Sequence, residues 1–151
     1  MVVFGRGGAG KSVLARELGI ITGLPVVELD KEFWSDELKP LPAEAGARYQ
    51  AMLAQQPRWI IEGDLGSYDD VEPRLRRADT VVVLDMPLWR CMWRAWRRGP
   101  EGHDFWAWTL RWRRHSRPRL LGAVSDLAPR AKVVILRSQR SVRRWLISVA
   151  S

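Results

Sequence analysis

The sequence predicts a single α/β domain, residues 1–151, built around a parallel β-sheet. The chain has 151 residues, 46% of them hydrophobic, which is typical of one domain with a sizeable core. Five short and almost continuously apolar segments alternate with segments of helical periodicity, as in a sheet that helices cover on both faces. A glycine-rich loop at residues 5–12 separates the first apolar segment from the first helical one.

In the first half of the chain, residues 2–4 predict the end of a buried strand, and apolar spacing predicts a helix at residues 12–18. The run Thr22-Gly23-Leu24-Pro25 ends this helix, because glycine and proline are typical of helix C-termini. An apolar strand is expected at residues 26–29, followed by Asp30. The next helix is expected at residues 42–56, ending before a proline.

The second half of the chain repeats this alternation. The run RWIIE at residues 58–62 predicts a third strand, followed by a Gly63-Asp64 turn. The run TVVVL at residues 80–84 predicts a fourth strand, followed by Asp85. The remaining expected elements are helices at residues 72–78, 88–98, 105–117 and 142–149 and a strand at residues 132–136.

The glycine-rich loop reads GRGGAGKS and matches the pattern G-x-x-x-x-G-K-[ST], which binds nucleotide phosphates. Its glycines let backbone amides approach phosphate oxygens at the N-terminus of a helix, where the helix dipole favours anions. Lys11 supplies a positive charge at the transferring phosphate, and the Ser12 hydroxyl is a candidate Mg²⁺ ligand. The predicted nucleotide-binding residues of the loop are Gly5, Gly7, Gly8, Ala9, Gly10, Lys11, Ser12 and Val13.

Acidic residues follow several of the expected strands, at the edge of the sheet where α/β domains bind ligands. Asp85 ends an apolar strand and is a candidate Mg²⁺ ligand. Asp30 is a candidate for the base that orients an acceptor hydroxyl in phosphoryl transfer. Glu62 and Asp64 lie at the end of the third strand. Each of these acids could instead cap the helix or turn that follows it.

Residues 88–121 are rich in tryptophan and arginine and are predicted to form a lid. Trp89, Trp93 and Trp96 share one face of a helix, and packing against the core is favoured over base stacking for them. A Gly-Pro-Glu-Gly hinge at residues 99–102 separates two helices. The arginines either clamp phosphates or form solvated helix faces. Four of them are predicted to stabilise the transferring phosphoryl group: Arg94, Arg98, Arg111 and Arg114.

Charge and cysteine content set further limits. The chain has 25 basic and 17 acidic residues, a net charge of +8, and arginine dominates among the basic ones. The single cysteine, Cys91, cannot form an internal disulfide, which favours the cytoplasm. No apolar run approaches the roughly 18 residues that span a membrane, so no membrane partner is expected. The oligomeric state stays open.

The loop has the more specific form G-x-x-G-x-G-K-S, which resembles that of adenylate kinase-like and shikimate kinase-like small P-loop kinases. Further runs resemble bacterial adenylate kinase-like proteins that are often labelled topology modulation proteins. These runs are LDKEFW at residues 29–34, IIEGDLGSY at 60–68, ADTVVVLDMP at 78–87, RPRLL at 117–121 and VVILRSQRSVRRWL at 133–146. The resemblance covers nearly the whole chain.

This resemblance implies a P-loop NTPase fold with the strand order 2-3-1-4-5, ATP·Mg²⁺ as the phosphoryl donor and an arginine-bearing lid. It implies that adenine packs against Arg137, Ser138 and Gln139. It places the acceptor near Asp30 and near a further set of residues: Trp34, Gly63 and Asp64.

The function expected from these observations is ATP- and Mg²⁺-dependent phosphoryl transfer to a small-molecule or nucleotide acceptor. The alternative is an ATP-binding, DNA-associated regulatory protein, which the family label and the charge of +8 suggest. No helix-turn-helix or zinc finger is visible, so nucleic-acid binding is expected to be weak. A GTPase is disfavoured, because the chain lacks an Asn-Lys-x-Asp motif.

Overall fold

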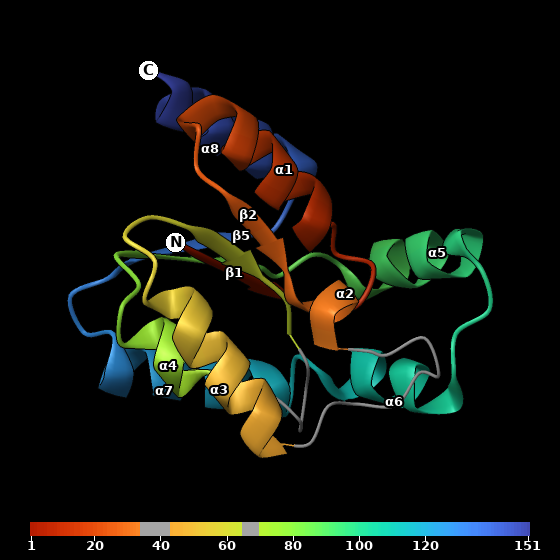
Figure 1. Cartoon of the computed structure of the whole chain (residues 1–151). Coiled ribbons are helices and arrows are strands. Elements are labelled where there is room, and N and C mark those ends of the chain that lie inside the picture. Colours follow the sequence, from red (N-terminus) through yellow and green to blue (C-terminus); the bar gives the residue numbers. More distant parts are fainter. Residues whose placement is uncertain (34–42, 65–69) are drawn as a thin grey trace.

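The computed structural model describes residues 1–33, 43–64 and 70–151, which form an α/β domain (Figure 1). Its five-stranded parallel sheet has the order β2-β3-β1-β4-β5, which confirms the expected fold class and strand order. The strands are β1 (Val2–Gly5), β2 (Val26–Glu28), β3 (Ile60–Glu62), β4 (Thr80–Leu84) and β5 (Lys132–Leu136). Because β1 pairs with both β3 and β4, the loop that follows it emerges at the centre of the carboxyl edge.

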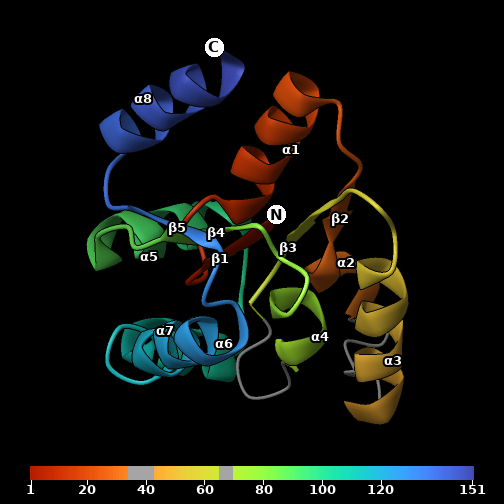
Figure 2. The same cartoon turned by 90° about the vertical axis from the view of Figure 1, so that its left-hand side faces the viewer.

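Helices cover both faces of the sheet (Figures 1 and 2). One face carries α1 (Lys11–Thr22) and α8 (Gln139–Ala150), and the other carries α3 (Ala43–Ala54), α4 (Glu72–Leu75) and α7 (Ser116–Leu127). The carboxyl edge carries α2 (Leu29–Phe33), α5 (Leu88–Arg98) and α6 (His103–Arg111). None of the helices in the described ranges is long and apolar enough to cross a bilayer.

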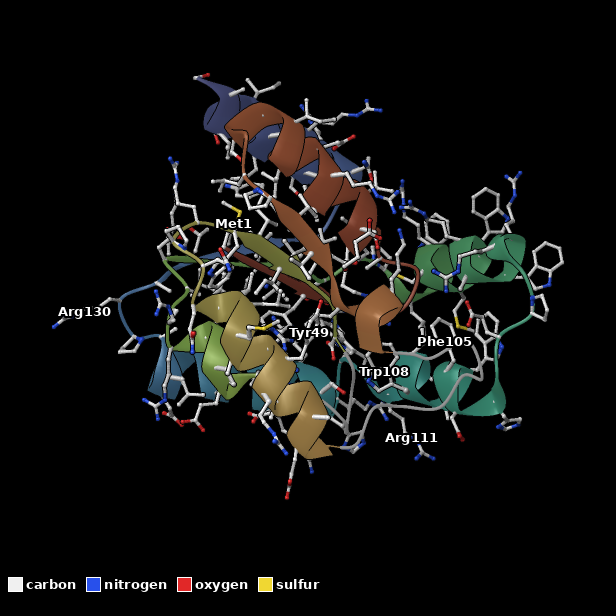
Figure 3. All side chains as sticks on the ribbon, viewed as in Figure 1. Met1, Tyr49, Phe105, Trp108, Arg111 and Arg130 are labelled. Atoms are coloured by element: carbon white, nitrogen blue, oxygen red, sulfur yellow. The ribbon has the colours of Figure 1, made fainter. Side chains whose placement is uncertain are left out.

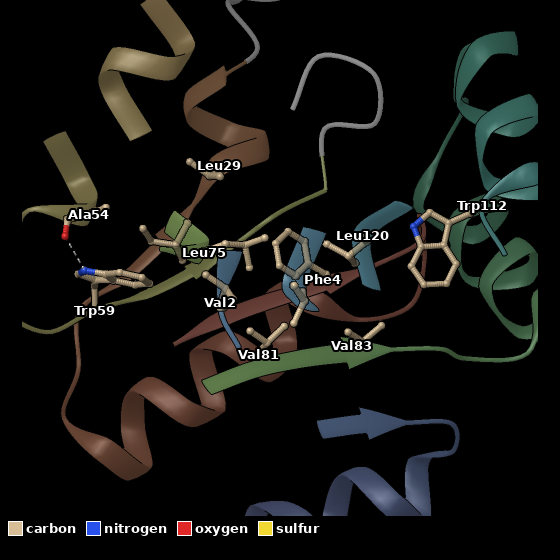
Figure 4. Packing of buried hydrophobic residues seen from close by; sticks show 13 residues of the cluster. Val2, Phe4, Leu29, Ala54, Trp59, Leu75, Val81, Val83, Trp112 and Leu120 are labelled. Atoms are coloured by element: carbon tan, nitrogen blue, oxygen red, sulfur yellow. Dashed lines mark hydrogen bonds between the residues drawn. The ribbon is translucent and has the colours of Figure 1, made fainter. Parts of the chain in front are cut away.

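The core has two parts, because successive residues of a strand point to opposite faces of the sheet. On one face, Phe4 packs with Leu75 of α4 and Leu120 of α7 (Figure 4). On the other face, Val3 packs with Leu18 of α1. This double coverage explains why the central strands are apolar at nearly every position.

Among the boundaries that differ from those expected from the sequence, two affect the site. Strand β2 ends at Glu28, so Asp30 lies in the short helix α2 rather than at a strand end. The single helix expected at residues 105–117 is divided, because α6 ends at Arg111 and α7 begins at Ser116. Pro118 lies in the first turn of α7, where its missing amide is tolerated. Much of the predicted lid segment 88–121 covers the carboxyl edge, whereas α7 packs into the core.

The orientation of α5 is opposite to the one expected, so the prediction that its tryptophans pack in the core is wrong. Trp89, Trp93 and Trp96 are 72%, 53% and 71% exposed, whereas Cys91 and Ala95 are fully buried. The inner side of α5 contacts the backbone of the glycine-rich loop. Small side chains permit that close approach, and indole rings would prevent it.

Candidate active site

The glycine-rich loop joins β1 to the N-terminus of α1. Gly8 and Gly10 have φ angles of 75° and 98°, which residues with side chains rarely adopt. Gly10 is the N-cap of α1 and no side chain caps this end, so the first amides of the helix are available to an anion. Lys11 is 7% exposed, and its Nζ lies 3.5 Å from the carbonyl oxygen of Arg6. The loop therefore has the backbone features that phosphate binding requires.

A buried carboxylate lies beside this loop. The Ser12 hydroxyl donates a hydrogen bond to Oε1 of Glu62 at 2.9 Å. Glu62 is fully buried, and its Oε2 atom has no hydrogen-bond partner among the described residues. Burial raises the pKa of Glu62, and the negative charge of Asp30 raises it further. The positive charge of Lys11 and the hydrogen bond from Ser12 act in the opposite direction and lower this pKa. A hydroxyl and an unsatisfied carboxylate oxygen fit Mg²⁺, which prefers oxygen ligands.

The described residues contain no group of three or more His, Cys, Asp or Glu side chains that could hold a metal ion. Glu62 was noted at a strand end but was not predicted as a metal ligand. The sequence places Glu62 at the end of the third strand, at the same edge as the loop, but it does not single out Glu62 as the acid that meets Ser12.

Asp85, the predicted metal ligand, is instead surrounded by guanidinium groups. Nε of Arg113 lies 3.3 Å from Oδ1 of Asp85, and Nε of Arg117 lies 3.2 Å from Oδ2. Nε of Arg137 lies 3.7 Å from Oδ2, and the Asp85 side chain is 1% exposed. The structure therefore pairs Asp85 with arginines and Ser12 with Glu62. The arginine contacts link β4 to α7, to the turn before it and to the segment after β5.

The predicted acceptor side lies between α2 and the turn after β3. A Cβ atom added at Gly63 would lie 3.6 Å from Oδ1 of Asp30, so these two predicted residues are neighbours. Asp30 also contributes to the electrostatic environment of Glu62. Trp34, the third residue expected there, lies outside the described residues.

Trp112 connects three parts of the site. The indole is fully buried, and its Nε1 donates a hydrogen bond to Oδ2 of Asp64 at 2.7 Å. The guanidinium of Arg6 lies 5.3 Å from the centre of the indole rings, and burial lowers the pKa of Arg6. The turn after β3, the lid segment and the phosphate loop thus meet at this side chain. The sequence did not identify either Trp112 or Arg6 as a site residue.

Helices α5 and α6 lie directly on the phosphate loop. A Cβ atom added at Gly8 would lie 2.1 Å from the carbonyl oxygen of Cys91 in α5. A Cβ atom added at Gly7 would lie 2.3 Å from the ring of Phe105, which Figure 3 shows beside α5 and α6. These contacts require glycine at both positions because of close approach. The loop is therefore covered by the lid segment in this structure.

The four predicted lid arginines have different surroundings. Nη1 of Arg94 would lie 3.0 Å from a Cβ atom at Gly10, so this guanidinium lies on the phosphate loop. Arg98 forms an ion pair with Glu101 in the hinge. Arg111 and Arg114 are exposed, and Figure 3 shows Arg111 on the outer side of α6. The structure thus brings Arg94 to the loop, and Arg113 and Arg117, which were not predicted, to Asp85.

The segment after β5 also reaches the phosphate loop. Gln139 and Gly10 both line a hollow of about 30 Å³ on this side of the loop. Ser138 caps α8, since its hydroxyl oxygen accepts a hydrogen bond from the backbone amide of Ser141 at 3.1 Å. Of the three residues expected at adenine, Gln139 therefore faces the loop, Ser138 caps a helix and Arg137 contacts Asp85.

Comparison with known proteins gives the fold of this chain. No family model and no curated protein matches the sequence. A sugar kinase from Janibacter is 25% identical with a TM-score of 0.56, and the match covers 99% of this chain and 96% of that chain. A shikimate kinase from Acinetobacter baumannii in complex with shikimate is 18% identical with a TM-score of 0.57, and the match covers 98% of this chain and 88% of that chain.

A deoxyadenosine kinase from M. mycoides with bound dCTP is 16% identical with a TM-score of 0.54, and the match covers 98% of this chain and 97% of that chain. The structural neighbours are thus small P-loop kinases, and this chain has their fold. The narrower resemblance to topology modulation proteins stays a prediction.

Proposed function

We propose that this protein is an ATP-dependent kinase that transfers a phosphoryl group to a small-molecule or nucleotide acceptor. One observation carries the proposal: the glycine-rich loop leads into the N-terminus of α1, and the Ser12 hydroxyl there donates a hydrogen bond to the buried carboxylate of Glu62. A phosphate cradle next to a hydroxyl–carboxylate pair suits a nucleotide that is bound with Mg²⁺. The kinase fold of the structural neighbours supports the same function.

The roles of the residues follow from their positions. Ser12 and Glu62 would hold Mg²⁺, which when bound neutralises charge on the phosphate oxygens. Lys11 and Arg94 lie on the loop and would stabilise the negative charge of the transferring group. Asp30, beside Gly63, would accept the proton of an acceptor hydroxyl or orient that hydroxyl.

Entry of the nucleotide requires α5 and α6 to move off the loop. Gly7 and Gly8 contact the lid helices directly. The structure therefore corresponds to a closed arrangement, and the proposed cycle includes an open one.

A binding and turnover screen tests the proposal. ATP·Mg²⁺ should raise the unfolding temperature of the protein, because a ligand that binds only the native state stabilises it. ADP formation should then be measured with nucleoside monophosphates, sugars and small alcohols as acceptors. Absence of any ATP-dependent stabilisation in the wild-type protein would contradict nucleotide binding, and binding without phosphorylated product from any acceptor would favour the DNA-associated alternative.

A further inference from the structure

We propose that the outer side of α5 docks onto the surface of a membrane that contains anionic phospholipid. The docking surface, called here the tryptophan face, consists of Trp89, Trp93 and Trp96 of α5 together with Trp106 of α6. The α5 residues are 72%, 53% and 71% exposed. The helix lies at the periphery of the molecule, and Figure 3 shows ring side chains projecting outward from it. The proposal does not depend on the kinase function, and it departs from the expectation of no membrane partner, which rested on the lack of a membrane-spanning segment.

The tryptophan face is apolar along a continuous strip. Met92, Trp93, Trp96 and Trp106 line an open groove of about 370 Å³, and the atoms that line it are apolar. The spacing i, i+4, i+7 aligns the three α5 indoles with the helix axis. An indole combines a large apolar body with one N–H donor and favours the boundary between hydrocarbon and headgroups. Such a helix is suited to lying in the plane of a membrane surface.

The charges of α5 favour an anionic surface. Arg97 is the α5 arginine beside the indoles, α5 contains no acidic residue, and the chain carries a net charge of +8. The guanidinium of Arg97 lies 4.8 Å from the centre of the Trp93 rings. Its apolar stem can lie along the indole while the guanidinium reaches a headgroup phosphate. Basic residues next to a membrane are attracted by the negative potential of anionic lipids.

The same observations disfavour single-stranded nucleic acid, which needs a cationic groove that follows its phosphates. Arg94 lies on the phosphate loop, Arg90 donates to Gln139 and Arg98 pairs with Glu101. These arginines are engaged within the protein, so Arg97 is the α5 cation beside the indoles.

A second copy of the chain is also disfavoured as the partner. A two-fold symmetric contact through this face would bring the basic α5 helices of both copies together, and α5 supplies no acidic residue to pair with them.

The experiment measures co-sedimentation with vesicles of phosphatidylcholine containing phosphatidylglycerol and with vesicles of phosphatidylcholine alone. The test variant is Trp89→Gln/Trp96→Gln, and the matched control is Ile20→Gln/Ile147→Gln, which replaces exposed apolar residues on α1 and α8. We expect the wild-type protein to bind the anionic vesicles more tightly. The test variant should bind them at least about tenfold more weakly, and the control variant should stay within about twofold of wild type.

Arg97→Gln provides a second test, because it should reduce the preference for anionic vesicles while leaving the indoles in place. Unchanged thermal unfolding should confirm that all variants are folded. The proposal is overturned if the wild-type protein does not sediment with anionic vesicles, or if the test variant binds them as well as wild type. Tryptophan-dependent binding to oligothymidine, or a tryptophan-dependent dimer, without vesicle binding would also overturn it.

Discussion

At the residue scale, two buried carboxylates of the site have opposite surroundings. Glu62 receives one hydroxyl hydrogen bond and keeps an unsatisfied oxygen, and burial raises its pKa. Asp85 is equally buried and its Oδ1 also lacks a hydrogen-bond partner among the described residues, but three guanidinium groups lie within ion-pair distance of it. A bound cation would offset the cost of burying the negative charge of Glu62, whereas the arginines already offset that cost for Asp85. We therefore propose Glu62 rather than Asp85 as a ligand of Mg²⁺ and a structural role for Asp85, and the predictions below separate the two.

Lys11→Ala should lower ATP affinity or turnover at least about tenfold, or about 1.4 kcal/mol. The substitution removes the charge that would face the β- and γ-phosphates and leaves the glycines of the loop unchanged. The unfolding temperature without nucleotide should change little, because Nζ makes one long hydrogen bond to a carbonyl oxygen and interacts with the Glu62 carboxylate only at longer range. Titration calorimetry and an ADP-release assay check this, and wild-type turnover in the folded variant would contradict the assignment of the loop.

Glu62→Gln should lower Mg²⁺-dependent turnover and yet stabilise the protein at neutral pH when Mg²⁺ and nucleotide are absent. Burial raises the pKa of Glu62 in the folded state above its ordinary value of 4.5. The protonated form thus favours folding at low pH, and this contribution is lost as the pH rises through the folded-state pKa. Glutamine keeps the shape and does not ionise.

Thermal unfolding of the wild-type and Glu62→Gln proteins between pH 4 and 8 measures this effect, and the advantage of the variant should appear above about pH 4.5. If the variant is less stable than wild type at neutral pH and retains normal turnover, Glu62 has only a structural role.

At the scale of elements, the contact between α5 and the phosphate loop decides whether the site is open. It is a backbone contact, since the carbonyl oxygen of Cys91 faces the α-carbon of Gly8. The C-terminal part of the lid segment is attached to the sheet through Asp85, which forms ion pairs with Arg113 and Arg117. Arg137, from the segment after β5, contacts the same carboxylate. One end of the lid segment is thus fixed electrostatically, whereas α5 is held by packing against the loop.

Gly8→Ala should destabilise the protein more than Gly23→Ala. Both residues have positive φ angles, and a left-handed conformation costs alanine about 1–2 kcal/mol. At Gly23 a Cβ atom would meet nothing within 4 Å, whereas at Gly8 it would lie 2.1 Å from the Cys91 carbonyl oxygen. The Gly8 variant should also expose the Cys91 thiol to alkylation, because α5 has to move away.

Urea unfolding and the rate of iodoacetamide modification measure these two effects, with Gly23→Ala as the control for backbone strain alone. Equal destabilisation of the two variants, together with an unreactive Cys91, would mean that α5 does not rest on the loop.

Asp85→Asn should lower stability by about 1–3 kcal/mol, because it removes the compensating charge from several guanidinium groups that are only partly buried. Hydrogen exchange should increase most in α7 and in the turn before it, which Arg117 and Arg113 attach to the end of β4. The Mg²⁺ concentration that supports half-maximal turnover should not change. A raised Mg²⁺ requirement with normal stability would instead restore Asp85 as the metal ligand.

At the scale of the whole molecule, the charge of +8 gives a general affinity for polyanions but no specificity. We expect binding to duplex DNA to be weak and to disappear as the salt concentration rises from about 50 to 200 mM. Fluorescence anisotropy with two unrelated duplexes of equal length measures this, and both should bind equally. Tight binding near physiological salt that depends on Arg111 and Arg114 would reverse the preference for a kinase over a DNA-associated protein.

The sequence by itself determined the fold class, the strand positions and the phosphate loop. Strands such as residues 80–84 were recognisable because a strand that is covered on both faces must be apolar throughout. The loop was recognisable because residues 5–12 carry its glycines, lysine and serine in one contiguous segment. The strand order was expected only through the family resemblance, and the structure confirms it.

Only the tertiary structure decided which side chains of the site meet. Ser12 and Glu62 are 50 residues apart in the sequence, and Asp64 and Trp112 are 48 apart. Periodicity predicted that α5 has a tryptophan face and an arginine face, but it did not show which side of the helix packs against the protein. The tryptophans face outward because the buried inner side of α5 carries the small residues Cys91 and Ala95, and the backbone of α5 contacts the loop at Cys91. Local patterns define the elements, whereas close packing between distant segments defines their partners.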